Sequence, residues 1–318
     1  MFQGRTHDSY YHEGGIVDKV GMMITARKLM RDVSDLPAIP GIVSQVISLL
    51  DNPDSDPDKV ADLILSDQVL AARVLRVVNS PIYRGTSEIN SVKRALMHIG
   101  FKAIREMILT KYFVDAFNAR EQPFDIKTFW LHSFNVGAVS RRIAGMVGYR
   151  DLEKAYLAGI IHDIGKVFMG HYLRKEYGEM LADIDGTQYR AYEAEQEFFG
   201  TSHSEVGLCL AQRWNFPPDY CDTISYHHTS ERAIADPMLT AIVSLSDFFC
   251  LTHDPATGVP NEQAGQPDRS EEHAWTVLKQ LSSQPLDRDI PSFFAAISGD
   301  YDEIAGEVNG LFRVLTRN

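Results

Sequence analysis

The sequence predicts an all-helical protein with two helical halves, and three features of its 318 residues lead to this prediction. Apolar residues recur at the three- and four-residue spacing of amphipathic helices along most of the chain. Runs in which valine, isoleucine and threonine alternate with polar residues, as they do in strands, are scarce. Proline, glycine and aspartate gather in short turns between the helical stretches. The hydrophobic content of 44% is normal for a globular chain, and the length has room for about two domains.

Residues 1–30 are expected to form an N-terminal extension. Gly14 and Gly15 interrupt it, and residues 17–30 have the pattern of one amphipathic helix. This helix would serve either as a connector or as a dimerisation segment, and the second role would make the protein a homodimer. The extension lacks the apolar stretch of a signal peptide, and no uncharged run in the chain reaches the roughly 18 residues that a membrane helix needs. We therefore expect a cytoplasmic protein without a membrane partner.

Residues 31–120 are expected to form an N-terminal bundle of five or six helices. Pro40 lies at or just before the start of the first helix, after an extended entry. Ser66 and Asp67 are candidate N-caps of a later helix, and Gly100 is a candidate C-cap. Reactive side chains do not gather in this half, so we interpret its apolar stripes as core. The expected helices cover residues 42–50, 60–65, 70–78, 92–99 and 104–117.

Residues 121–252 are expected to form a second helical core, and residues 253–318 a loop and a helical tail. The tract at residues 252–270 is rich in proline and glycine and therefore predicts a loop. Thr201 or Ser202 would cap a helix that starts at His203. The expected helices of the core and tail cover residues 129–144, 155–170, 189–199, 203–214, 220–228, 239–251, 273–281 and 304–315.

Charge and cysteine content argue against a nucleic-acid partner and against two kinds of cysteine site. The formal net charge of −12 argues against a nucleic-acid partner, because contacts with phosphates need a basic face. A small anionic ligand held by local cations remains compatible with this charge. The three cysteines are far apart and no CxxC motif occurs, which argues against a disulfide framework and against a thiolate zinc site.

The most informative stretch is residues 155–170, AYLAGIIHDIGKVFMG, which we interpret as one buried helix. Burying His162, Asp163 and Lys166 costs on the order of several kcal/mol unless each finds a partner. A metal ion would satisfy an adjacent imidazole and carboxylate, and polar groups on neighbouring helices are the alternative. Lys166 lies three residues after Asp163 and four after His162, so the three share one side of the helix.

Further polar residues stand on the apolar helices of the same half. A single buried histidine is usually a core residue with a hydrogen-bonded partner, but these residues are spread over five predicted helices, which could bring them to one point. Imidazoles and carboxylates without a thiolate suit iron, manganese, zinc or nickel. If Asp163 bridged two ions, the pair would activate water and stabilise an in-line displacement at phosphorus, and Lys166 would bind a phosphoryl oxygen. The candidate residues are His132, His162, Asp163, Lys166, His203, His227, His228 and Asp247.

The order His, His-Asp, His, His-His and Asp resembles the HD phosphohydrolase superfamily, which is all-helical and metal-dependent. Residues 31–250 resemble more specifically the HDOD domain, the HD-related output domain of bacterial signalling proteins. The motifs that carry this resemblance are LPAIPGIVSQVISLL, SDQVLAARVLRVVNSPIY, INSVKRALMHIGFKAIREMIL, FWLHSFNVGAVSRRIA, HDIGKVFMGHYL and HSEVGLCLAQRWNFP.

The resemblance implies an N-terminal bundle packed on an HD-type core, with a signalling or regulatory role. It also implies iron or manganese as the metal, held by the matching residues His132, His162, Asp163, His203, His227, His228 and Asp247. Many HDOD members have lost such ligands, whereas this sequence keeps them. Thr128 stands where the three-metal HD-GYP enzymes have a glutamate, and HHTSERAIADP replaces their Gly-Tyr-Pro loop. The resemblance therefore does not extend to a third metal or to cleavage of cyclic-di-GMP.

Two functions remain open at this point. One is a signalling module with a dinuclear metal centre that is structural or senses a ligand, and whose partner is a signalling protein or a small phosphorylated ligand. The other is a metal-dependent phosphohydrolase or phosphodiesterase for a nucleotide or cyclic dinucleotide, with Lys166 and Asp163 as catalytic residues. The family resemblance favours the module, whereas the complete set of ligand residues favours the enzyme, and we expect the module. An enzyme needs an open coordination position that substrate can reach, whereas a structural site is closed.

Overall fold

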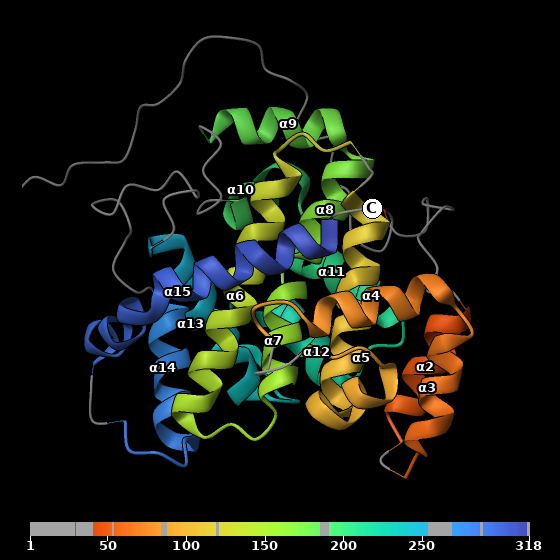
Figure 1. Ribbon diagram of the computed structural model, residues 1–318. Helices are drawn as coiled ribbons and strands as arrows, with labels where there is room; N and C mark the ends of the chain where they lie inside the picture. The colour runs from red at the N-terminus through yellow and green to blue at the C-terminus, as the bar shows by residue number, and fades with distance from the viewer. Residues whose placement is uncertain are drawn as a thin grey trace, which may run out of the picture.

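All regular elements in the described part of the chain are helices, as the sequence predicted (Figure 1). The structure is a computed structural model that describes residues 29, 41–52, 54–83, 88–118, 121–184, 191–253, 269–286 and 289–316. The predicted helix at residues 17–30, except Leu29, and most of the predicted loop at residues 252–270 lie outside these ranges. Among the residues described, none of the helices is both long and apolar enough to cross a bilayer.

The N-terminal half is built from α2 (Gly41–Leu50), α3 (Pro57–Leu65), α4 (Gln68–Val78) and α5 (Val92–Asn118). Asp67 caps α4, since its carboxylate accepts hydrogen bonds from the backbone N–H groups of Val69 and Leu70. The predicted stop at Gly100 is a kink within α5, where the backbone has φ 84° and ψ 167° before the helix resumes. A positive φ is accessible to glycine without strain, which explains this residue at the kink.

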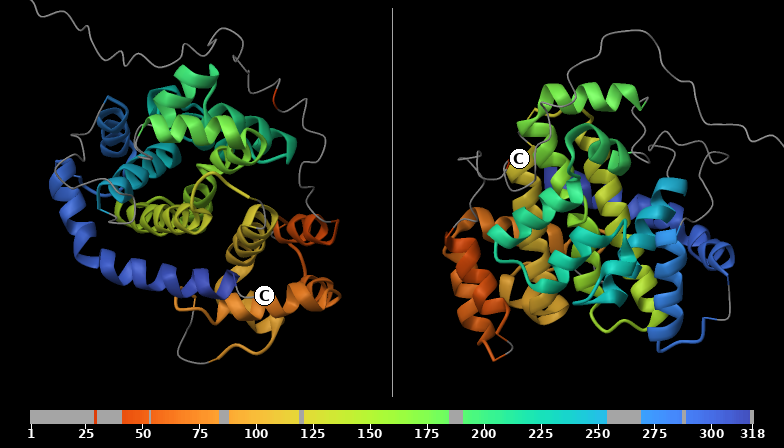
Figure 2. Two further views of the ribbon diagram at one scale, coloured as in Figure 1. Left: turned by 90° about the horizontal axis from the view of Figure 1, so that it is seen from above. Right: turned by 180° about the vertical axis from the view of Figure 1, so that it is seen from behind.

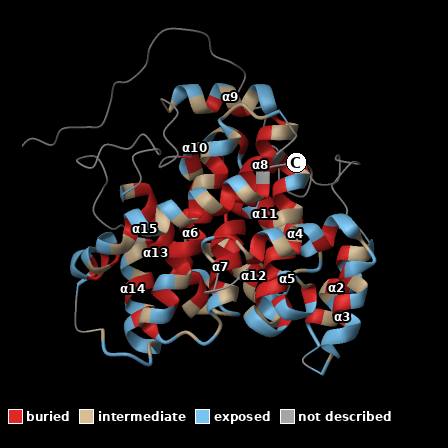
Figure 3. Ribbon diagram, viewed as in Figure 1, coloured by how far each residue is buried: buried red, intermediate tan, exposed pale blue. Residues whose placement is uncertain are grey.

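The second half is a compact core of helices, and the helix sides that face the middle of this core consist mostly of buried residues (Figure 3). α6 packs against α7 and α13, and α11 packs against α8 and α12. The elements are α6 (Ile126–Val147), α7 (Leu152–Ile161), α8 (Ile164–Tyr172), α9 (Arg174–Asp183), α10 (Ala191–Phe199), α11 (His203–Arg213), α12 (Pro218–Tyr226), η3 (Ser230–Arg232) and α13 (Pro237–His253).

The prediction of a single helix over residues 155–170 is wrong, because α7 ends and α8 begins at the pair His162–Asp163. Asp163 has φ −98° and ψ 13°, which leaves the helical region and redirects the chain. The new direction brings Gly165 against the start of α11, where an added Cβ would lie 1.9 Å from the carbonyl oxygen of His203.

The tail links the two halves. α14 (Arg269–Leu281) packs on α13, and α15 (Ile290–Thr316) crosses α6 and reaches α4 and α5 (Figure 2). The sequence predicted this last helix from residue 304 only. It starts earlier because Asp289 accepts a hydrogen bond from the backbone N–H of Ser292 at 2.9 Å, and because Pro291 suits a first helical turn.

Candidate metal centre

The structure brings all eight predicted site residues into one cluster, although the helices that carry them are far apart in the sequence. Each residue of the cluster is within 3.6 Å of at least one other through a side-chain nitrogen or oxygen atom. The residues are His132 on α6, His162 and Asp163 between α7 and α8, Lys166 on α8, His203 at the start of α11, His227 and His228 after α12, and Asp247 on α13.

One part of the cluster lies between α6, α13 and the α7–α8 junction. His132, His162 and Asp163 each offer a ligand atom, and these atoms lie within 4.8 Å of one another. Asp247 completes this group, because its Oδ1 is 3.0 Å from Nε2 of His132 and 3.5 Å from Nε2 of His162. Two imidazoles and two carboxylates therefore face a common point.

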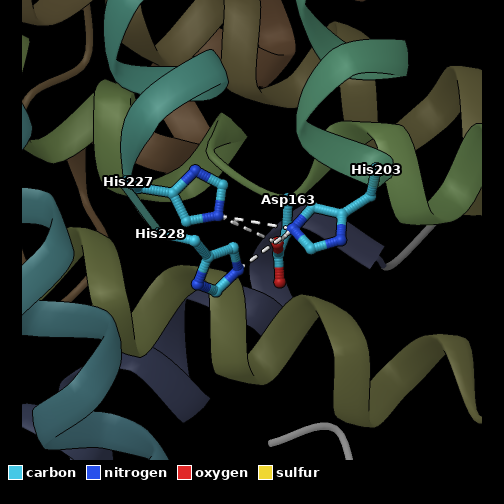
Figure 4. A group of neighbouring side chains, drawn as sticks. All are labelled: Asp163, His203, His227 and His228. Atoms are coloured by element: carbon cyan, nitrogen blue, oxygen red, sulfur yellow. Dashed lines mark hydrogen bonds and ion pairs between the residues drawn. The ribbon is translucent and has the colours of Figure 1, made fainter. Parts of the chain in front are cut away.

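The other part of the cluster contains three imidazoles around the same Asp163 (Figure 4). Oδ1 of Asp163 is 3.1 Å from Nε2 of His203 and 3.6 Å from Nε2 of His227. Nε2 of His228 is 3.2 Å from Nε2 of His203. Oδ2 of Asp163 instead faces His162 at 3.3 Å, so the two oxygens of one carboxylate are directed at the two groups of histidines.

Hydrogen bonds to the backbone fix two of the rings. Nδ1 of His162 donates to the carbonyl oxygen of Gly159 at 2.6 Å, and Nδ1 of His227 donates to that of Ile224 at 3.0 Å. A proton held at Nδ1 leaves the lone pair of a neutral ring on Nε2, which in both residues faces the cluster. The α-helical turn that precedes each histidine supplies the carbonyl group, so the local fold selects the tautomer.

Glu195 belongs to the site and was missed by the sequence analysis, which interpreted its helix as an acidic amphipathic one. Its side chain is fully buried, and Oε2 accepts hydrogen bonds from the backbone N–H and from Nδ1 of His203, both at 2.6 Å. Oε1 accepts a hydrogen bond from the hydroxyl of Tyr177 at 2.5 Å. A signal did exist: Glu195 lies four residues after Ala191 and four before Phe199, on the buried face of α10.

The two carboxylates of the cluster and two of its imidazoles have the charges that metal ligands need. Burial raises the pKa of Asp163, but His162, Lys166 and His203 outweigh it and hold that pKa well below its usual range. The pKa of Asp247 is likewise low, because the nearby imidazoles of His132 and His162 outweigh the effect of burial. Burial lowers the pKa values of His227 and His228, which keeps both rings neutral.

His162 and His203 behave differently from His227 and His228. Burial lowers the pKa of His203, but the carboxylates of Glu195 and Asp163 outweigh it and raise that pKa above its usual value. The effect at His162 is larger. Burial lowers its pKa, but the carboxylates of Asp163 and Asp247 reverse the effect and raise the pKa to about 10. A metal ion at this position would therefore displace a proton from the ring.

Several buried atoms of the cluster lack a hydrogen-bond partner among the residues that the structure describes. They are Nδ1 and Nε2 of His132, Nε2 of His162, Oδ1 of Asp163 and Oδ1 of Asp247, and the contacts of 3.0–3.6 Å given above for these atoms do not have the geometry of hydrogen bonds. In addition, Nε2 of His203 lies 3.4 Å from Nε2 of His227, although both rings are expected to hold their proton at Nδ1. Two lone pairs that face each other repel, and a cation between them removes the conflict. The donors are nitrogen and oxygen atoms, so the residues fit a divalent transition metal.

Access to the cluster is narrow. His162, Asp163 and His203 are fully buried, and of the other predicted site residues only His228 is half-exposed. The ring of Tyr192 on α10 lies 4.7 Å from the ring of His228, measured between centroids, and is half-buried itself. Among the predicted site residues, the side chain of His228, next to Tyr192, therefore has the most contact with solvent.

Lys166 lies in the cluster, but its Nζ is bonded to Oδ2 of Asp163 at 2.6 Å. Burial lowers the pKa of this amine, while the carboxylates of Asp163 and Asp247 overcome the effect and raise it, so the group stays charged. Its role in binding a phosphoryl oxygen stays a prediction. Thr128 lies at the exposed start of α6, where its hydroxyl donates to Asp125 at 2.6 Å.

Comparisons with known proteins identify relatives over most of the chain. The family model of the HDOD domain matches residues 36–230. An uncharacterised protein of Treponema pallidum is 25% identical over 207 residues, which are 63% of this chain and 39% of that protein. The match thus spans about two fifths of the relative's length.

Solved structures share the fold. An HDOD domain protein of unknown function from Geobacter sulfurreducens is 33% identical, with a TM-score of 0.76 over 92% of this chain and 99% of that one. A candidate phosphohydrolase from Shewanella amazonensis is 22% identical, with a TM-score of 0.68 over 91% and 98% of the two chains. A candidate signal transduction protein from Marinobacter aquaeolei is 18% identical, with a TM-score of 0.71 over 93% and 63%. Because the family model covers more than half of the residues and the Geobacter protein matches along its whole length, this chain belongs to the HDOD domain family.

Proposed function

We propose that this chain is a signalling or regulatory module whose core holds a dinuclear divalent-metal centre. His132, His162, Asp163 and Asp247 would hold one ion, and Asp163, His203, His227 and His228 would hold the other. The observation that carries the proposal is the position of Asp163, whose two oxygens face the two groups of histidines at 3.1–3.6 Å. A carboxylate placed in this way is suited to bridge two cations.

Burial of the ligands favours a module over an enzyme. A catalytic metal keeps a coordination position that substrate can reach, whereas structural sites are closed. Here the ligands of the first ion are all buried, and only His228 of the second set is half-exposed. The name of the signal transduction protein from Marinobacter supports the same function, which we extend to this chain as part of the proposal. As a module it would act on a signalling protein or respond to a small phosphorylated ligand.

The second candidate is a metal-dependent phosphohydrolase or phosphodiesterase for a nucleotide or cyclic dinucleotide. The complete ligand set together with the charged Lys166 favours it, as does the name of the Shewanella protein. When bound, a metal pair supplies Lewis acidity and an activated water for displacement at phosphorus. In this reaction Lys166 would leave Asp163 to bind a phosphoryl oxygen, and the cluster would have to become accessible to substrate.

Elemental analysis of protein purified without chelators tests the proposal. We expect two divalent ions per chain, of which iron and manganese are the first candidates and zinc or nickel the next. Asp163→Asn should lose both ions, whereas His253→Ala, which removes an exposed histidine outside the cluster, should keep both. Wild-type protein with fewer than two ions would contradict the dinuclear centre.

A panel of phosphomonoesters and phosphodiesters, including cyclic dinucleotides, separates the module from the enzyme. The module predicts no turnover by the fully metal-loaded protein. Hydrolysis that disappears in Asp163→Asn, while circular dichroism shows an intact helical fold, would establish the enzyme instead.

A further inference from the structure

Glu195 holds His203 in a way that no other imidazole of the cluster is held. For His162 and His227, a backbone carbonyl accepts the proton on Nδ1, whereas for His203 the acceptor is a fully buried carboxylate at 2.6 Å. The same carboxylate accepts the backbone N–H of His203, also at 2.6 Å. Ring and backbone of this residue are therefore tied to one group on α10.

Glu195 is itself fixed by its surroundings. The hydroxyl of Tyr177 on α9 donates to Oε1 at 2.5 Å, and the two hydrogen bonds from His203 use Oε2. A buried carboxylate that accepts three hydrogen bonds is well satisfied and has little freedom to rotate. The position of this carboxylate is thus set by α9, α10 and the start of α11.

A carboxylate that accepts the proton on Nδ1 changes how an imidazole binds a metal through Nε2. It fixes the ring orientation and makes the coordinating nitrogen more basic than a carbonyl acceptor does. This effect would be confined to His203, whose Nε2 faces Asp163, His227 and His228. Among the residues that the structure describes, Glu195 forms hydrogen bonds and ion pairs with Tyr177 and His203 and with none of His132, His162 and Asp247, which belong to the other group.

We propose that Glu195 is a positioning residue that controls the affinity of the second ion alone, so that the two ions of the centre bind with separable strengths. The inference rests on the proposed dinuclear centre. Loss of the carboxylate should release the ion bound by His203, His227 and His228 and leave the ion bound by His132, His162 and Asp247 in place. In this way α9 and α10, which contribute no ligand of their own, become part of the metal centre.

Glu195→Gln isolates the charge, because the amide can keep the hydrogen bonds. Its oxygen can accept from His203, and its NH₂ group can donate to the hydroxyl of Tyr177. Titration of the metal-free protein with Mn²⁺ should give one site of wild-type affinity and a second whose Kd is raised about 10–100-fold, the usual effect of removing such an outer partner. Tyr177→Phe should weaken the same site by a smaller factor.

Electron paramagnetic resonance of the Mn²⁺-loaded protein provides a readout that does not depend on activity. At a concentration of Mn²⁺ that fills both sites of the wild type, the coupled signal of a metal pair should become the signal of a single ion in Glu195→Gln. His132→Ala, the matched change in the other group, should instead weaken the first site. If Glu195→Gln folds poorly, Glu195→Asp, which keeps the charge but withdraws it by one methylene, should weaken the second site in the same way.

The possible failures are distinguishable. Glu195→Gln protein that binds two ions with wild-type affinities and gives the coupled signal would overturn the role of Glu195 and leave the dinuclear centre intact. Equal weakening of both sites would also overturn it, because it would indicate a general loss of structure. Wild-type protein that binds fewer than two ions would overturn the proposed function, and this inference with it.

Discussion

The substitution Gly165→Ala tests whether the contact between α8 and α11 sets the geometry of the metal centre. An added Cβ would lie 1.9 Å from the carbonyl oxygen of His203, 2.8 Å from its carbonyl carbon and 2.9 Å from the backbone nitrogen of Gly207. All three atoms belong to the backbone, so no side-chain rotation can relieve the overlap. A carbon–oxygen contact needs about 3.3 Å, so the two helices would have to separate by roughly 1.4 Å.

This separation should affect both stability and metal binding. Overpacking of a rigid core typically costs about 1–3 kcal/mol in the free energy of unfolding, and an overlap with backbone belongs at the upper end of that range. The movement would also carry His203 away from Asp163, where Nε2 and Oδ1 are now 3.1 Å apart. We therefore expect Gly165→Ala to lower stability by about 3 kcal/mol and to weaken the second ion more than the first.

Urea unfolding and Mn²⁺ titration measure the two effects. The matched control is Gly145→Ala in α6, where an added Cβ meets nothing within 4 Å. Because alanine is a better helix former than glycine, this control should raise stability by about 0.5–1 kcal/mol and leave metal binding unchanged. A Gly165→Ala protein with wild-type stability and two tightly bound ions would refute the reasoning.

Two further predictions concern pH and metal removal. Burial raises the pKa of Glu106 from 4.5 to about 8, against the opposing effect of Arg105, so the folded state keeps a proton that the unfolded chain releases at lower pH. The contribution of Glu106 to the free energy of unfolding should therefore fall as the pH rises from 4.5 to 8, by up to about 1.4 kcal/mol per pH unit. Urea titrations at several pH values measure this slope, and Glu106→Gln should remove it. An unchanged slope in the variant would contradict the raised pKa of Glu106. Removal of the metal by a chelator should lower the Tm of the wild type, because a ligand at 100 times its Kd stabilises the folded state by about 2.7 kcal/mol. A Tm that changes neither with chelator nor with added Mn²⁺ would contradict the metal centre.

The sequence was sufficient to predict the fold class and the meeting of the site residues. The recurrence of apolar residues at helical spacing predicted the fold class. The second prediction followed because His132, His162 and Asp247 stand on helices that are otherwise apolar, where an imidazole or carboxylate needs a partner. Asp67 was also predictable as an N-cap, since a short acidic side chain just before an apolar helical run can accept hydrogen bonds from the first backbone N–H groups of the helix.

The remaining features depend on tertiary packing. One long buried helix and two short ones have the same apolar pattern, so the break at His162 and Asp163 could not be read from residues 155–170. The contact that follows the break joins Gly165 to α11, a relation that no local pattern contains. Glu195 was missed because acidic residues surround it on α10, and only its spacing from Ala191 and Phe199 marks the buried face.

The cluster also explains why this core needs a cation to be satisfied. His203 and His227 have their Nδ1 protons engaged by Glu195 and by a backbone carbonyl, so their Nε2 atoms meet as two acceptors at 3.4 Å. In the metal-free protein a proton on His203 can relieve the conflict, because the carboxylates of Glu195 and Asp163 outweigh burial and raise the pKa of this ring, whereas the lowered pKa of His227 opposes a proton there. A divalent ion resolves the same conflict and neutralises Asp163 and Asp247 as well. Metal binding should therefore be coupled to the packing of α6, α8, α11, α12 and α13, which is the property that a regulatory centre requires.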